Sequence, residues 1–259
     1  MNSRLHLFVL VTTLLWGELT SSLQAELIFN PNFDGAMTQI QKDVVNQAIN
    51  DWRSVFSGVS GTSQTINFAV SLSSLGTNTL GQWSGGYSGV PFGTNVRPWT
   101  PQVTHTIEFN ADRINDNTLR FDLANPISSP TFWDALSVAR HEIGHMLGFT
   151  SLYDNIALNG TVTNPWTSRI VNDSFDSGNL NVAMNPGDSA HLAQGLGLLM
   201  SPGLVNNTRL PISGTEAQML SLAYGYNIVA VPEPASLLLV GMVIPIGYFG
   251  FRRHLKRAA

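Results

Sequence analysis

The chain has 259 residues, of which 43% are hydrophobic and 12% charged, a composition typical of a folded domain and not of a disordered chain. The net charge is −4, and the central region has no basic cluster that could meet a phosphate backbone, so we expect no nucleic-acid partner. The chain has no cysteine, so a disulfide framework is excluded, and the core and any bound metal must hold the fold.

The first 25 residues are typical of a secretory signal peptide. Arg4 precedes the apolar run 7–16, and the segment ends in a small residue, Ala25. Because that run is too short to cross a bilayer, we expect a cleaved signal and an exported protein. An uncleaved anchor is the alternative.

The region 26–230 is expected to form one domain of the α+β class. Apolar residues at steps of three and four predict an amphipathic helix over 36–57. Alternating patterns predict strands over 65–72 and 104–109. The Gly- and Ser-rich stretch between these strands, 76–100, is expected to be an irregular connection.

A second helix is expected to follow the prolines at 126 and 130 and to run to about Leu147. Thr131 with Asp134 fits a capping-box start for this helix. The polar stretch 151–187 predicts no helix, and a last short helix is expected over 214–223.

The carboxyl terminus combines three features in order: Pro232-Glu233-Pro234, an apolar run over 235–251 and a basic end. The run is just long enough to span a bilayer, with the basic end on the cytoplasmic side. Residues 231–259 thus resemble a bacterial PEP-CTERM sorting tail. The resemblance implies a Gram-negative envelope protein, held in the inner membrane by this helix until an exosortase-type enzyme cuts near the Pro-Glu-Pro segment. A plain C-terminal anchor is the alternative.

The second helix carries the segment His141-Glu142-Ile-Gly-His145. Residues four apart lie on one helix face, so His141 and His145 can present two imidazoles to one zinc ion. Glu142 projects at a neighbouring angle, where it can reach a water on the metal and act as the catalytic general base. The alternative is a helix whose histidines make structural hydrogen bonds.

A catalytic zinc site needs a third protein ligand and an open position for water. Two further histidines lie in 26–230: His105 at the start of a predicted strand, and His191 beyond the polar insert. Aspartates could also serve, because zinc accepts carboxylate ligands. The main rival is Asp154, close after the helix, and the less favoured ones are Asp173, Asp176 and Asp188.

The motif His141-Glu142-x-x-His145-x-x-Gly148-Phe149, a long insert, His191 and then Leu199-Met200-Ser-Pro202 resembles the metzincin metallopeptidases, most closely the leishmanolysin-type branch. The resemblance implies that His191, 43 residues after Gly148, is the third zinc ligand. It implies that Met200 packs beneath the metal and that Gly148 turns the chain back towards it. It also implies an N-terminal helix against a small twisted sheet, the active-site helix beneath, and an irregular C-terminal half.

Other residues depart from the family pattern or have two interpretations. Pro202 stands where some metzincins place a tyrosine that steadies the oxyanion. Tyr224 or Tyr226 could take that role, but core packing is favoured for both. Glu108 and Asn110 are interpreted as a solvated strand edge, although in metzincins such a strand lines the cleft and pairs with an extended peptide.

These patterns together predict an exported, membrane-tethered zinc metalloendopeptidase with a protein or peptide substrate. The reaction would be hydrolysis by an activated water without a covalent intermediate. The alternative is a non-catalytic envelope or matrix surface protein with a structural zinc site, which would be closed by a fourth protein ligand. A hydrolase with a non-peptide substrate is a third possibility.

Overall fold

The structure is a computed structural model that describes residues 25–59, 61–88, 96–125, 129–150, 152–153, 156–158, 161–163 and 165–229. The predicted signal peptide, apart from Ala25, and the predicted sorting tail lie outside these residues. Within the described ranges, no helix combines the length and the apolar character needed to cross a membrane.

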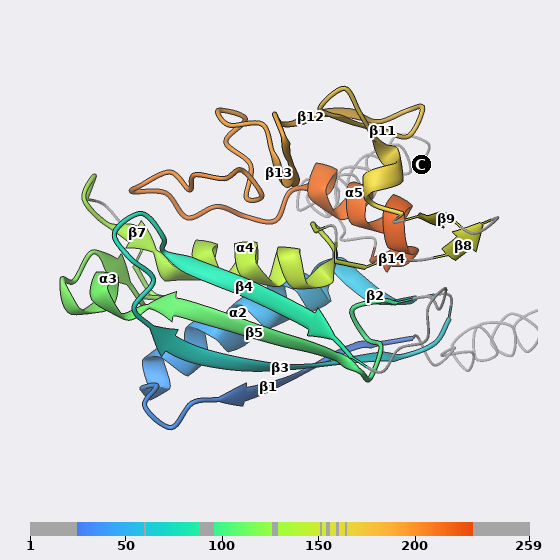
Figure 1. Ribbon diagram of the computed structural model, residues 1–259. Helices are drawn as coiled ribbons and strands as arrows, with labels where there is room; N and C mark the ends of the chain where they lie inside the picture. The colour runs from blue at the N-terminus through green and yellow to red at the C-terminus, as the bar shows by residue number, and fades with distance from the viewer. Residues whose placement is uncertain are drawn as a thin grey trace, which may run out of the picture. The chain divides into compact units, whose positions relative to one another are not determined.

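A four-stranded sheet forms the base of the fold (Figure 1). Across the sheet the order is β1 (Leu27–Phe33), β3 (Gln64–Ser73), β5 (Val103–Asn110) and β4 (Gly81–Tyr87). The first three strands run parallel, whereas β4 runs antiparallel to β5. β4 is therefore an edge strand, and it lies beside helix α4 (Ala135–Leu147) (Figure 1).

Two helices, α2 (Gln39–Val55) and α4, pack against each other and against the sheet. Alternate residues of β3 are buried, so one face of the sheet belongs to the core and the other is open. The indole of Trp52 on α2 donates to the Arg140 carbonyl of α4 at 2.9 Å, and Arg140 forms an ion pair with Asp51 at 2.6 Å. α4 is thus held by apolar packing and by polar contacts.

The structure corrects where the two predicted helices begin. α2 starts after Thr38, whose side chain forms a capping box with Gln41, and it ends where the short strand β2 (Phe56–Val59) begins. α4 starts after Asp134, whose carboxylate accepts from the Ser137 amide at 3.0 Å. The predicted capping box of Thr131 with Asp134 is therefore wrong.

Pairing with another strand explains this late start of α4. Trp133–Asp134 forms the short strand β7, which pairs in parallel with β6 (Leu119–Arg120) and keeps the backbone extended. The Asp134 carboxylate is also paired with Arg209 at 2.9 Å. The helix can begin only where this pairing ends.

The connection over 76–100, expected to be irregular, contains the strand β4. Its sequence has three glycines and a weak intrinsic preference for strand, but β4 pairs with β5 along all of its seven residues. Strand propensity depends on such tertiary context, which outweighs the local sequence here.

β5 therefore lies inside the sheet, and the interpretation of Glu108 and Asn110 as a solvated edge is wrong. Asn110 is fully buried; its side chain caps the short helix α3 (Ala111–Asn115) and donates to two carbonyls of the preceding loop at 2.6 Å each. Glu108 is half-buried and accepts from the Ser73 hydroxyl.

The C-terminal half consists of short strands and turns. Its described strands are β8 (Ile156–Leu158), β9 (Thr161–Thr163), β10 (Ile170–Val171), β11 (Ser174–Asp176), β12 (Asn181–Asn185) and β13 (Asp188–Leu192), with one 3-10 turn at Thr167–Arg169. The last helix is α5 (Gly214–Tyr224), close to its predicted range, and β14 (Tyr226–Ile228) pairs back onto β2. α4 lies between this half and the sheet (Figure 1).

Candidate metal centre

The buried face of α4 presents His141 and His145, each with only 7% of its surface exposed. Gly144 between them allows close approach of the following half of the chain. A Cβ atom at Gly144 would lie 2.4 Å from the sulfur of Met200. Met200 is completely buried, so the thioether packs directly against the helix that carries both histidines.

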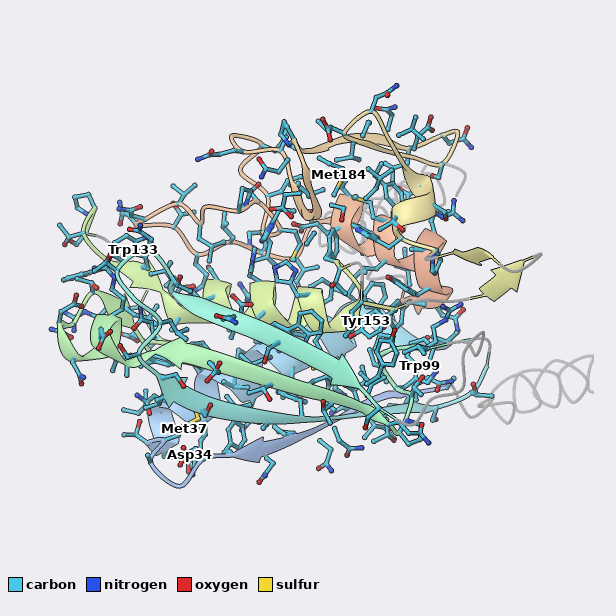
Figure 2. The ribbon with its side chains drawn as sticks, viewed as in Figure 1. Asp34, Met37, Trp99, Trp133, Tyr153 and Met184 are labelled. Carbon is cyan, nitrogen blue, oxygen red and sulfur yellow. The ribbon has the colours of Figure 1, made fainter. Side chains whose placement is uncertain are left out.

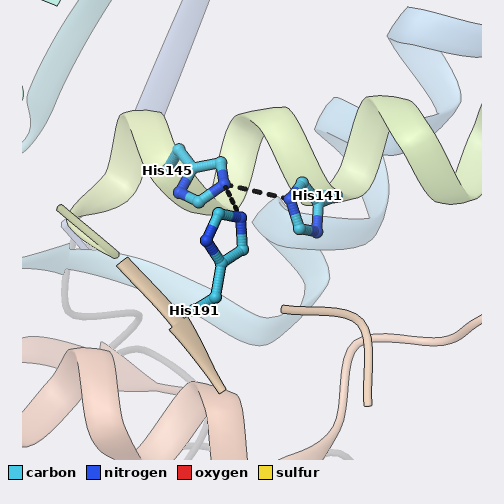
Figure 3. A group of neighbouring side chains, drawn as sticks. All are labelled: His141, His145 and His191. Carbon is cyan, nitrogen blue, oxygen red and sulfur yellow. Dashed lines mark hydrogen bonds between the residues drawn. The ribbon is translucent and has the colours of Figure 1, made fainter. Parts of the chain in front are cut away.

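The third imidazole comes from β13. His191 lies beside the two helical histidines, as Figure 3 shows, with its Nε2 atom 3.1 Å from that of His145. The Nε2 atoms of His141 and His145 are 3.0 Å apart. A backbone hydrogen bond of 2.8 Å from Leu192 to Met200 ties β13 to the loop that carries the methionine.

Each imidazole is oriented through its other ring nitrogen. The Nδ1 atoms of His141 and His145 face the carbonyls of Leu199 and Phe149 at 2.7 and 2.8 Å. The Nδ1 atom of His191 faces a carboxylate oxygen of Asp188 at 2.6 Å. Because all three partners are acceptors, we assign the ring proton to Nδ1, which leaves three Nε2 lone pairs directed at one another.

This arrangement favours a cation at the centre. Burial lowers the pKa of His141 to about 4 and holds the pKa of His145 well below its usual value, so both rings are neutral at pH 7. Because these two rings resist a further proton, protonation does not readily relieve the repulsion between their lone pairs. A cation bound between the nitrogens would do so.

The spacing fits a tetrahedral ion. Zinc binds imidazole nitrogen at about 2.0–2.1 Å, and tetrahedral angles then put two such nitrogens roughly 3.3 Å apart. The observed separations of 3.0 and 3.1 Å are close to that value. Among the described residues, no other histidine or carboxylate joins this group, which leaves a fourth position for water or substrate.

Glu142 lies beside the histidine cluster without joining it. Its carboxylate accepts a hydrogen bond from the backbone N–H of Trp83 on β4, and its Oε1 atom is 3.3 Å from the place of a Cβ atom on Gly81. Burial raises the pKa of Glu142 to about 8, against a smaller opposing effect of that hydrogen bond. A raised pKa beside a metal-binding cluster is typical of a general acid or base.

The three histidines and Glu142 line a cleft of about 570 Å³. The start of β4 forms one wall and the Pro202–Leu204 segment forms part of another. The cleft reaches from Thr150, after the end of α4, to Trp133 and Arg113 near its beginning. Figure 2 shows Trp133 at the amino-terminal end of α4 and Tyr153 towards the carboxyl-terminal end.

Two tyrosines that could have stabilised an oxyanion are committed elsewhere. The hydroxyls of Tyr224 and Tyr226 donate to the carbonyls of Gly148 and Leu147 at 2.9 and 3.0 Å, and both side chains are buried. Neither lines the cleft. Gly148 ends α4 at a φ of 136°, and a Cβ atom there would lie 2.1 Å from the ring of Tyr224. The tyrosines thus secure the end of the helix.

The structure does not bring those rival ligands that it describes to the cluster as metal ligands. Asp173 and Asp176 accept from the backbone amides of Gly187 and Gly178. Asp188 orients His191, and Asp154 lies outside the described residues. His105 is buried on β5, with its Nε2 atom 2.8 Å from the Pro98 carbonyl.

Sequence reasoning missed three supporting groups. The amide of Trp83 lies in a segment expected to be irregular, and Asp188 was considered only as a ligand. Glu216 is completely buried, and its carboxylate accepts from the Met200 and Ser213 amides at 2.7 and 2.8 Å. The spacing of Ser213 and Glu216 is a capping signal that the sequence shows, but the sequence does not show that Glu216 also binds the Met200 amide.

The chain was also compared with known proteins. It matches no model of a known protein family and no curated protein. The resemblance to metzincins therefore remains an expectation from the motif residues.

Proposed function

We propose that the protein is a zinc metallopeptidase. His141, His145 and His191 are the zinc ligands, and Glu142 is the general base. One observation carries the proposal: three imidazole nitrogens converge beside a buried carboxylate, and all four side chains line one open cleft. Such a constellation suits hydrolysis by an activated water.

Zinc held by the three histidines would lower the pKa of a water at its open position and polarise the scissile carbonyl. Glu142 takes the proton of the attacking water and delivers it to the leaving nitrogen. A positive charge in the cluster favours the ionised carboxylate, which opposes the rise in pKa caused by burial. The Trp83 amide orients the carboxylate from the opposite wall.

The outer edge of β4 is the proposed binding site for the substrate backbone. Its free amide and carbonyl groups can pair with an extended peptide, and the Trp83 amide, which donates to Glu142, shows that this edge faces the cleft. Glu142 lies near Gly81 and Val138, towards the beginning of α4. Since Glu142 protonates the leaving amine, the carboxyl-terminal part of the substrate extends in that direction, towards Arg113.

The alternative of a purely structural zinc site is less well supported. A structural site is closed by four protein ligands, whereas the cluster of described residues has three. A structural site also gives no role to a buried glutamate that lines the cleft beside the ligands.

The cellular setting is proposed from sequence alone. The signal-like segment 1–25 and the tail 231–259 suggest export across the inner membrane of a Gram-negative bacterium. The apolar run 235–251 would tether the protein there, and an exosortase-type enzyme would be its processing partner. Cleavage of the tail would release the peptidase to the cell surface or matrix.

Substitution of Glu142 by glutamine tests the mechanism. We expect the full-length Glu142→Gln protein to retain one zinc per chain and to lose hydrolysis of unfolded casein by about 100-fold or more, as removal of a general base does. Zinc content is measured by mass spectrometry and hydrolysis by release of labelled fragments. Full activity in this variant, or no hydrolysis of any protein or peptide by the zinc-loaded wild type, would sink the proposal.

A further inference from the structure

We infer that Arg113 selects substrates with a carboxylate on the carboxyl-terminal side of the scissile bond. The inference rests on the proposed function and adds the chemical class of the substrate. The carboxylate can come from an aspartate or glutamate side chain, or from the end of the substrate chain. Both sources offer the same planar anion, which a guanidinium binds with paired hydrogen bonds.

Arg113 lies at the end of the cleft that the substrate's carboxyl-terminal part would reach. It is carried by α3 and lines the cleft with Trp133. The guanidinium carbon lies 5.2 Å from the centre of the Trp133 ring. The position of the guanidinium over an aromatic face supports it and limits its orientations.

The hydrogen-bonding capacity of Arg113 is only partly used. One terminal nitrogen donates to the Thr77 carbonyl, and the other lies 3.4 Å from a carboxylate oxygen of Asp116. That is a long contact, and the second oxygen of Asp116 accepts from the Thr118 hydroxyl and amide. The Nε atom is buried and has no hydrogen-bond partner among the described residues.

The charges around this end of the cleft favour an anion. Among the described residues that line the cleft, Arg113 alone has a permanent positive charge, and the one carboxylate is Glu142 in the proposed catalytic group. Asp112, next to Arg113 in the chain, is exposed and accepts from the Ser74 hydroxyl. Asp116 does not line the cleft. A substrate carboxylate would therefore meet an incompletely paired cation.

The length of the cleft limits where that carboxylate can lie. Ala135, the first residue of α4, precedes His141 by six residues, a rise of about 9 Å along the helix, and Trp133 lies two residues earlier, in the extended strand β7. An extended peptide covers about 3.3 Å per residue, so roughly three to five residues after the scissile bond span this region. Leu80, Val138 and Leu204 also line the cleft and offer apolar contact to the methylene groups of a substrate side chain.

A binding experiment with the full-length, zinc-loaded Glu142→Gln protein tests the inference without turnover. The probes are extended ten-residue peptides with amidated ends that carry either Glu or Gln at one position of the carboxyl-terminal half. A further pair is neutral and ends in a free acid or an amide. We expect the acidic member of at least one pair to bind about 10-fold tighter, in the range of a charge-assisted hydrogen bond. The pair that shows this preference identifies the source of the carboxylate.

Three further variants in the same background assign the preference to Arg113. Arg113→Gln should abolish it, and Arg113→Lys should keep part of it, because a charge without the planar fork remains. Arg120→Gln is the matched control. Arg120 also lies over an aromatic ring, with its guanidinium carbon 4.3 Å from the centre of Phe132, and its Nε atom also has no partner within the part of the chain that the structure describes, but Arg120 does not line this cleft. This variant should keep the full preference.

Equal binding of the acidic and neutral probes would overturn the inference, and so would a preference that survives in a folded Arg113→Gln protein. Circular dichroism of each variant checks the fold. The proposed function is tested separately, by hydrolysis. If the zinc-loaded wild type hydrolysed nothing, the proposed function would fail, but the binding experiment would still show whether acidic probes bind better. Conversely, efficient hydrolysis with no acidic preference would remove only the role of Arg113.

Discussion

The helical half and the C-terminal half of the domain supply the candidate ligands in different ways. His141 and His145 lie about one turn apart on the same face of α4, are almost fully buried and are oriented by backbone carbonyls. His191 lies on the short strand β13, is half-buried and is oriented by a carboxylate. The helix therefore positions its two histidines by regular geometry, whereas the C-terminal half positions His191 by individual polar contacts.

Two carboxylates show the same contrast. Burial raises the pKa of Glu142 on the helical side to about 8. Burial alone would also raise the pKa of Asp188, but hydrogen bonds from His191, Ala190 and Asn185 lower it on balance. The helical side thus stores a carboxyl group that resists ionisation, and the C-terminal side an ionised one that orients a ligand.

The comparison predicts that the C-terminal ligand is the more sensitive to its supporting residue. Asp188→Asn replaces the anionic acceptor of His191 and should weaken zinc binding by about 10- to 100-fold, the usual effect of a residue that orients a metal ligand. Competition with a zinc chelator measures this affinity. Asp176→Asn, in the same group of strands, is the control and should leave the affinity unchanged. An unchanged affinity in Asp188→Asn would mean that β13 alone positions His191.

The buried carboxyl group predicts a pH dependence of the metal-free protein. A folded-state pKa of about 8, above the ordinary value of 4.5, means that Glu142 stabilises the fold fully below pH 4.5 and loses that contribution as the pH rises through 8. Between pH 6.5 and 8 the loss should be about 2 kcal/mol relative to Glu142→Gln, since one pKa unit corresponds to about 1.4 kcal/mol. Urea unfolding with a chelator at both pH values measures it. An equal change with pH in the free energy of unfolding of the two proteins would contradict the raised pKa.

A smaller effect on stability is expected at Glu216, which holds the loop of Met200 against α5. Glu216→Gln replaces one carboxylate oxygen, which accepts from the Met200 or the Ser213 amide, by an NH₂ group that cannot accept. We expect a loss of about 1 kcal/mol in the free energy of unfolding, the net contribution of one hydrogen bond. The zinc affinity should fall slightly, because the Leu199 carbonyl beside Met200 orients His141. A loss of stability with no change in zinc affinity would limit Glu216 to a structural role.

Strong periodicity and motif spacing made the helical half readable from sequence. Apolar steps of three and four located α2 and α4, and the His-Glu-x-x-His spacing identified the two histidines that the structure brings together on α4. The start of α4 was missed by several residues because the pairing of β7 with β6 holds the backbone extended, and no local signal reports a two-residue strand.

The features that the sequence did not predict depend on long-range contacts. The sequence of β4 has no clear alternation, and only its pairing with β5 makes it a strand that lines the cleft. The approach of His191 was inferred from resemblance, because a separation of 43 residues from Gly148 has no spacing rule of its own. The roles of Asp188 and Glu216 depend on partners that a pattern cannot identify, such as the amide of Met200.

X-ray absorption spectroscopy at the zinc edge of the full-length, zinc-loaded protein tests the central claim most directly. The account predicts three imidazole nitrogens at about 2.0–2.1 Å and one further light atom from water, and two imidazoles in His191→Ala. His105→Gln should keep the spectrum of the wild type, since His105 lies outside the cluster. A wild-type spectrum with two imidazoles, or with four protein ligands and no open position, would contradict a catalytic site built from both halves.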